Sequence, residues 1–220
     1  MRGKLRHVRF LPLLVCVAVL VGRASSAQYT AEPELAPGAI LLANAKLADP
    51  NFAQTVILIV QFEPENGAEG LILNRQSELS LAGIFADSKR ATKDPVYMGG
   101  PVQIRIAQAL LRLPDKTGQA IHVVSDIYVS GAKELIDKSI DAQTEPSKFR
   151  LYLGYAGWAS GQLQAELRLG AWSLLSGSSK LIFDAHPETL WARLTHNTQT
   201  RLADAAPFSA PGWFLKFPGS

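Results

Sequence analysis

One segment of the chain, Thr55–Phe62 (TVILIVQF), carries apolar or β-branched side chains at nearly every position. A strand of this composition is buried on both faces, so it belongs in the middle of a sheet. Asn66-Gly67 follows it closely, and this dipeptide is typical of a tight turn between paired strands. Glu69–Leu73 then supplies the second strand of a predicted hairpin. The chain is therefore expected to fold around a sheet in which Thr55–Phe62 is central.

Further strands are expected where short apolar runs lie between turn residues. These runs are Ala39–Ala43, Val96–Met98, Ala107–Leu113, Ala120–Val124, Phe149–Tyr155, Ala171–Leu175 and Lys180–Phe183. About four short helices fit between them. Three are expected to start at a serine cap: Ser80 for Leu81–Ala86, Ser130 for a helix to about Ala142, and Ser160 for Gly161–Leu169. The fourth is expected to have Pro187 in its first turn. Strands outnumber helices and do not alternate with them, which indicates an α+β fold.

The first 27 residues have the pattern of a secretory signal peptide. Basic residues precede an apolar run, Phe10–Val21, which is shorter than the roughly 20 residues needed to span a bilayer, and cleavage is expected after Ala27. An uncleaved membrane anchor and a wrongly assigned start are the alternatives. Residues 28–37 are expected to be a linker, 38–201 a folded domain, and 202–220 an aromatic, proline-containing tail that either packs on the domain or docks a partner.

Removal of the signal segment changes the charge balance. The full chain has 22 basic and 19 acidic residues, and five of the basic residues lie in the first 27, so the mature chain would carry a net charge of −2. A nucleic-acid partner is not expected at this charge. The single cysteine, Cys16, lies in the signal segment. We therefore expect a periplasmic or secreted domain without disulfides, with a cytoplasmic or membrane-anchored protein as the alternative.

No established catalytic motif is present: the sequence has no Walker loop, GxSxG, HExxH or CxxC. His122, His186 and His196 lack a second ligand at convincing metal spacing. The sequence thus predicts no catalytic residue, metal or cofactor, and it favours a non-enzymatic protein without deciding the question.

Three polar or glycine-rich clusters are candidates for binding a ligand or partner. Asn74-Arg75 follows a strand, where the Asn would complete a turn and the Arg could bind an anion. Gly99-Gly100 permits an anion-binding nest or a sharp bend. In the third, Trp158 precedes a helix on which Gln162 and Glu166 share one face. This pair would either lock the strand to the helix or bind a ligand, and the lock is the favoured interpretation.

These clusters, in this order, resemble the YqgE/AlgH family. The matching stretches are Ala48-Asp49-Pro50-Asn51-Phe52 with Thr55-Val56, Gly67 to Arg75, Gly99-Gly100-Pro101-Val102, and Leu153 to Trp158 through Gly161-Gln162-Leu163 to Glu166 and Trp172. The resemblance implies an α+β fold whose split, strongly bent, mostly antiparallel sheet forms a partly open barrel-like core. It implies no assigned reaction and no catalytic residues.

The chain departs from the family pattern at several positions. Asn44-Ala45 replaces Met-Pro, Gln61-Phe62 replaces a common Glu-His pair, and Gln76 replaces a proline. The signal segment and the tail are additions. We therefore expect a binding or regulatory protein of the cell envelope, with an unknown protein or small molecule as its partner. An enzyme with a site near Asn74/Arg75 and Gln162/Glu166, and a cytoplasmic transcriptional regulator, are the alternatives.

Overall fold

The computed structural model describes residues 33–205. The predicted signal peptide (1–27), residues 28–32 of the predicted linker and residues 206–220 of the predicted tail lie outside the described residues. Within 33–205, no helix combines the length and the apolar character needed to cross a bilayer.

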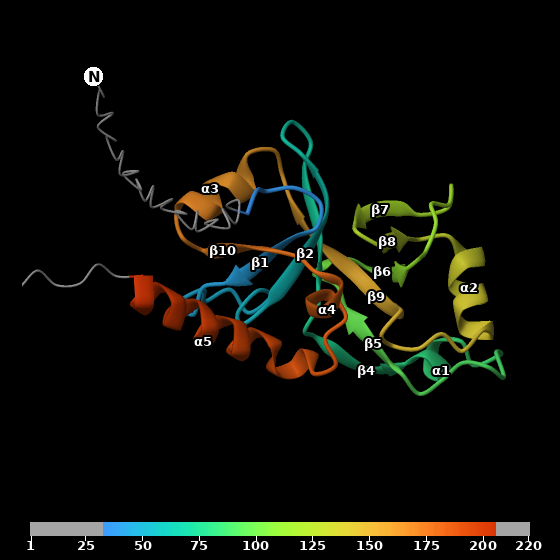
Figure 1. Cartoon of the computed structure of the whole chain (residues 1–220). Helices are drawn as coiled ribbons and strands as arrows, with labels where there is room; N and C mark the ends of the chain where they lie inside the picture. Colours follow the sequence, from blue (N-terminus) through green and yellow to red (C-terminus); the bar gives the residue numbers. More distant parts are fainter. Residues whose placement is uncertain (1–32, 206–220) are drawn as a thin grey trace, which may run out of the picture. The chain divides into compact units, whose positions relative to one another are not determined.

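The core is a ten-stranded sheet that is antiparallel except where β5 pairs with β9. The strands are β1 (Ala39–Ala43), β2 (Val56–Glu63), β3 (Gly67–Ile72), β4 (Gln76–Ser80), β5 (Pro95–Met98), β6 (Val102–Arg112), β7 (Ile121–Val124), β8 (Ile127–Ser130), β9 (Phe149–Trp158) and β10 (Trp172–Ser176). Their order is β10-β1-β2-β3-β9-β6-β8-β7, and β5 pairs with β4 and β9 off this path. This confirms the α+β class and the bent, split sheet: it curls into a half-barrel (Figure 1).

Strand β9 explains much of the curl. One edge pairs with β6, while the opposite edge pairs first with β5 and then with β3. At the change of partner lies Gly154, with φ of 69°, a backbone conformation that favours glycine. The register of β6 also shifts here, between Val102 and Ala107, which leaves the intervening residues as a large bulge. Bulges of this kind bend and twist a strand, and here they close the sheet partway into a barrel.

In the part of the chain that the structure describes, five helices pack on the sheet: α1 (Leu81–Ile84), α2 (Lys133–Asp141), α3 (Gln162–Arg168), α4 (Ser179–Ile182) and α5 (Pro187–Ala205). Inside the curl, apolar side chains of the strands pack with Ile182, Phe183 and Leu190 from α4, α5 and the link between them. Outside, α3 covers β1–β3, and α1 with α2 covers β6 and β9 (Figure 1). Because β2 lies between these layers, Val56–Val60 are fully buried, as its composition predicts.

Several expected elements differ in the structure. The predicted strand Lys180–Phe183 is the short helix α4, which Ser178 caps by accepting a hydrogen bond from Leu181 N at 3.3 Å. A short apolar run does not distinguish a strand from a buried turn of helix, so the cap determines the outcome. Strands β4 and β8 were not expected. Residues 33–205 form five helices, where about four were expected. Helix α5 has 19 residues, so residues 202–205 of the predicted tail are helical.

Two predicted helix caps are wrong and one is confirmed. Ser80 caps α1 by accepting from Gly83 N at 3.2 Å. Ser130 instead ends β8, where its hydroxyl donates to Gln119 O and accepts from Ala132 N, and α2 starts at Lys133. Ser160 donates to Pro64 O at 2.9 Å and does not cap α3.

Candidate functional site: the mouth of the half-barrel

The Trp158–Gln162–Glu166 cluster forms a closed hydrogen-bond network. One carboxylate oxygen of Glu166 accepts from the indole nitrogens of Trp158 and Trp172, at 2.9 and 2.8 Å. The other accepts from the Gln162 amide at 2.9 Å, and the Gln162 carbonyl accepts from Ala159 N at 3.0 Å. Buried indole N–H groups need an acceptor, and Glu166 provides one for both rings. These bonds join β9, α3 and β10, as the favoured interpretation of the cluster expected.

Gly99 and Gly100 allow β9 to pass at backbone contact distance. A Cβ on Gly99 would lie 2.2 Å from Gly154 O, and one on Gly100 would lie 2.2 Å from Tyr155 C. Gly99 N already donates to Leu153 O at 2.8 Å, and Gly99 O accepts from Ile72 N at 2.9 Å. The structure therefore uses this pair to bring two segments of the sheet together.

Asn74 and Arg75 hold the loop that precedes β2. The Asn74 carbonyl accepts from Val56 N at 2.8 Å, and its amide donates to Gln54 O at 2.9 Å. Arg75 donates to Asn51 O at 2.7 Å. Phe52, in the same loop, lies against both Trp158 and Trp172, with ring centroids 6.1 and 5.8 Å apart. The loop thus connects the Asn74 cluster with the Glu166 cluster, and no hydrogen bond between the described residues joins the two directly.

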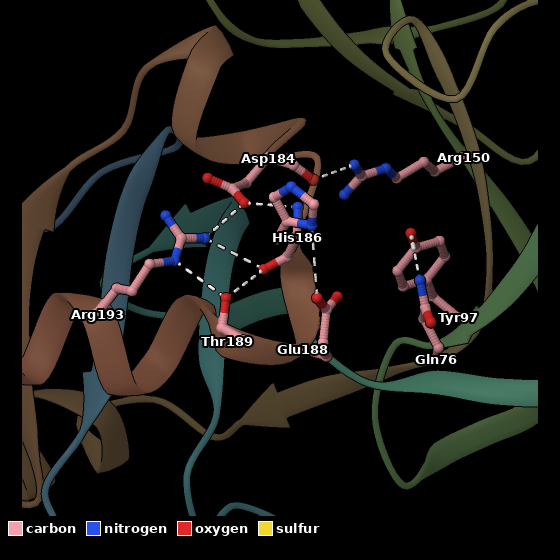
Figure 2. A network of polar contacts seen from close by, with 8 residues as sticks. All are labelled: Gln76, Tyr97, Arg150, Asp184, His186, Glu188, Thr189 and Arg193. Atoms are coloured by element: carbon pink, nitrogen blue, oxygen red, sulfur yellow. Dashed lines mark hydrogen bonds and ion pairs between the residues drawn. The ribbon is translucent and has the colours of Figure 1, made fainter.

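A second polar network, which includes the buried Arg150, lies at the α4–α5 corner and was not expected from the sequence (Figure 2). Arg150 of β9 is only 5% exposed, lies over the rings of Tyr97 and Phe183, and donates to the carbonyls of Asp184 at 2.6 Å and Ile182 at 3.5 Å. Burial raises the pKa of Tyr152, next to it, far above the usual value, and the Arg150 charge opposes this shift. Arg150 therefore attaches the corner to the sheet.

The open side of the half-barrel, unlike the clusters above, is hollowed by grooves. Two adjoining grooves border the β2–β3 hairpin, and we call them together the mouth. One, of about 400 Å³, lies between the hairpin, β9 and the start of β6, and the other, of about 370 Å³, lies between the hairpin and strands β6, β7 and β8. They meet at Gln61 and Glu69, which face each other across the hairpin. Tyr155 and Trp158 line one groove, and Ile106 and Ile121 line the other.

The mouth combines a carboxylate that has no partner among the described residues with exposed apolar surface. Glu69 is half-buried, and its carboxylate makes no hydrogen bond or ion pair with any residue from 33 to 205. Ile106 and Ile121 are 50% and 49% exposed. Exposed apolar groups beside a few polar ones are typical of a recognition surface.

Seven residues were predicted to bind a ligand or partner. Within the described chain, Trp158 is the only one of them that lines the mouth. Asn74, Arg75, Gly99, Gly100, Gln162 and Glu166 take part in the contacts described above. Sequence reasoning noted that Gln61 departs from the family pattern but did not connect it with Glu69. The available signal was their position on the two predicted strands, on either side of the Asn66-Gly67 turn.

Within residues 33–205 there is no group of three or more His, Cys, Asp and Glu side chains positioned to hold a metal ion. His122 and His186 lie apart: the first contacts Ser125 O and the Tyr128 ring, and the second lies 3.6 Å from Glu188.

The curled half-barrel with its outer helices defines the class of protein, and comparison with known proteins gives the family. The AlgH-like family model matches residues 40–203. A UPF0301 protein of Chlorobaculum tepidum is 36% identical over 160 residues, which cover 72% of this chain and 84% of the relative. A UPF0301 protein of Thermobifida fusca is 35% identical, covering 78% and 91%. The chain belongs to the AlgH-like (YqgE/AlgH, UPF0301) family.

Two solved structures have a similar fold. The solution structure of the AlgH protein from Pseudomonas aeruginosa is 32% identical, with a TM-score of 0.60, over 79% of this chain and 95% of that one. A Corynebacterium diphtheriae protein has a TM-score of 0.63 at 21% identity, over 76% and 89% of the two chains.

Proposed function

We propose that this chain is a binding protein and that it recognises its partner at the mouth of the half-barrel. The observation that carries the proposal is the mouth itself, where an unpaired carboxylate on Glu69 lies beside the half-exposed Ile106 and Ile121. A half-buried carboxylate loses part of its hydration, and no described residue replaces the lost water as a hydrogen-bond donor. A bound ligand could provide that donor.

A second observation supports the same location. The polar clusters that mark the family are occupied by internal contacts: Glu166 with two indoles and Gln162, and Asn74 with Val56 N and Gln54 O. These bonds join strands, helix α3 and the loop before β2. We infer that the family signature maintains the half-barrel and that recognition takes place beside it.

We further propose that the mature domain works in the cell envelope. The support is the basic head, the short apolar run and the small residues up to Ala27. Mass spectrometry of the native N-terminus tests this. A first residue near Gln28 is expected, and an intact Met1 would contradict export.

A pull-down from envelope extract tests the binding function. The tagged chain should retain a partner that Ile121→Ser loses and Leu169→Ser keeps. Leu169 is a matched control, because it is 85% exposed and lies outside both grooves. The partner is then purified and its binding to both variants is measured directly. Equal binding to the two variants would rule out the mouth as the recognition surface.

A further inference from the structure

Two strand edges that border the mouth lack partners. On its β1 side, β2 is paired only from Val56 to Leu58, so within the described chain no strand is hydrogen-bonded to residues 60–63 on that edge. Among residues 33–205, strand β7 pairs with β8 alone and ends the sheet. Free edges present unpaired backbone N–H and C=O groups, which proteins usually cover or pair.

These edges converge at one end and separate at the other. At the narrow end, Gly38 donates to Ile59 O at 2.8 Å and lies so close to Val124 that a Cβ on it would be 2.6 Å from the Val124 Cβ. At the wide end, Gln61 of β2 and Ile121 of β7 line opposite sides of the 370 Å³ groove. We call the space between the two edges the seam. In Figure 1 the β2–β3 hairpin and β7 stand on its two sides.

The lining of the mouth selects for positive charge. Glu63 and Glu69 are among its residues, and none of the described Lys, Arg or His residues lines either groove. Glu63 already accepts a hydrogen bond from the Asn66 amide, so Glu69 is the carboxylate of the mouth without a donor among the described residues. A basic side chain of a ligand would restore the lost interactions of this carboxylate.

We propose that the seam accepts an extended segment of a partner protein with basic side chains alternating with apolar ones. The inference rests on the proposed function and names the chemistry of its partner. An extended chain can pair with a free edge by backbone hydrogen bonds, and its alternate side chains point to opposite faces. The face with the basic side chains then points into the mouth, where a basic group reaches Glu69 and the aliphatic stems pack against Ile106 and Ile121, which line the same groove.

Fluorescence anisotropy with a labelled synthetic peptide of alternating lysine and valine tests the proposal on the purified chain. Its counterparts replace lysine by glutamate or methylate the backbone nitrogens. Wild-type protein should bind the lysine peptide, and this binding should weaken as the salt concentration rises. It should bind neither the glutamate peptide nor the backbone-methylated peptide. Glu69→Gln should weaken binding by about tenfold, the loss expected for one charge-assisted hydrogen bond. Glu78→Gln, on the exposed strand β4, should leave binding unchanged.

Other results overturn the proposal. No binding of the lysine peptide, equal binding of the lysine and glutamate peptides, or an equal loss in Glu69→Gln and Glu78→Gln would each contradict it. Two alternative occupants are also distinguished. If deletion of residues 206–220 creates binding that the full chain lacks, the tail of this chain fills the seam. If Ile121→Ser converts a dimer to a monomer in sedimentation, a second copy does.

The two proposals fail separately. If the partner found in extract depends on Ile121 but the lysine peptide does not bind, the mouth is the recognition surface and an extended basic segment is not its ligand. If the partner does not depend on Ile121, the proposed function itself is wrong.

Discussion

Glu166 and Glu69 are both half-buried glutamates near β9, but their surroundings differ. Glu166 accepts hydrogen bonds from two indole rings and one amide, so its carboxylate is satisfied within the fold. Glu69 lines the mouth and has no such partner in the described chain. The first residue belongs to the most recognisable motif of the chain, and the second lies in an ordinary strand. A distinctive motif here indicates an architectural joint, whereas an unsatisfied group indicates a place for a partner.

Gly99→Ala should have the largest effect on the architectural side of this comparison. The new Cβ would lie 2.2 Å from Gly154 O, a backbone atom held in the sheet, so the strands must move apart. We expect a loss of about 3 kcal/mol or more in the free energy of unfolding, measured by urea denaturation. Gly118→Ala is the control, because nothing lies within 4 Å of its Cβ. Equal stability of the two variants would contradict the close approach.

Glu166→Ala should destabilise the protein by about 2–3 kcal/mol, because it leaves two buried indole N–H groups without their acceptor. Glu166→Gln should lose less stability, because the carbonyl oxygen of the glutamine can still accept a hydrogen bond from an indole N–H. Denaturation followed by tryptophan fluorescence measures both. The lysine-peptide affinity of the folded variants should stay at the wild-type value. A change in affinity without loss of stability would make Glu166 a recognition residue and end the contrast with Glu69.

Asn74→Ala should cost about 1–2 kcal/mol, because Val56 N and Gln54 O each lose a partner at the start of β2. Asn74→Asp keeps the acceptor for Val56 N and should retain part of this stability. Denaturant midpoints of the three proteins give the order. If Asn74→Ala is as stable as wild type, Asn74 has no structural role in this loop and becomes a candidate for recognition again.

Asp126 extends the comparison to a partly exposed ion pair in the turn between β7 and β8. A hydrogen bond from Ser179 lowers its pKa from 3.8, partial burial opposes the shift, and Arg112 at 2.7 Å adds to it. Because the folded-state pKa is depressed, the stabilisation is present above pH 3.8 and is lost as the pH falls through the folded value. Asp126→Asn should therefore lower the free energy of unfolding by less than about 1 kcal/mol at neutral pH, because the Arg112–Asp126 pair is partly exposed. The difference from wild type should become smaller in acid. If the stability difference between Asp126→Asn and wild type becomes larger in acid, the folded protein does not lower the pKa of Asp126.

Much of the fold could be predicted because its signals are local. The β-branched run of β2, the Asn66-Gly67 turn and the spacing of Gln162 and Glu166 each describe contacts within a few residues. Strand β4 could not be predicted in this way, because it is a polar edge strand that only β5 stabilises. The mouth was missed for a related reason: Glu69 and Ile121 become neighbours only when the bulges curl the sheet, and no local pattern encodes that contact.

Glu69→Gln should have the smallest effect on stability, within about 0.5 kcal/mol of wild type, because no protein hydrogen bond depends on the charge. Removing a partly desolvated carboxylate can even stabilise the fold slightly, as is common where a residue serves binding. Matched denaturation curves of Glu69→Gln and Glu166→Gln measure the contrast directly. If Glu69→Gln instead loses more than about 1 kcal/mol, its carboxylate has a structural partner, and the argument for an unsatisfied charge at the mouth fails. If stability is kept while the lysine peptide is lost, the two glutamates divide architecture and recognition between them.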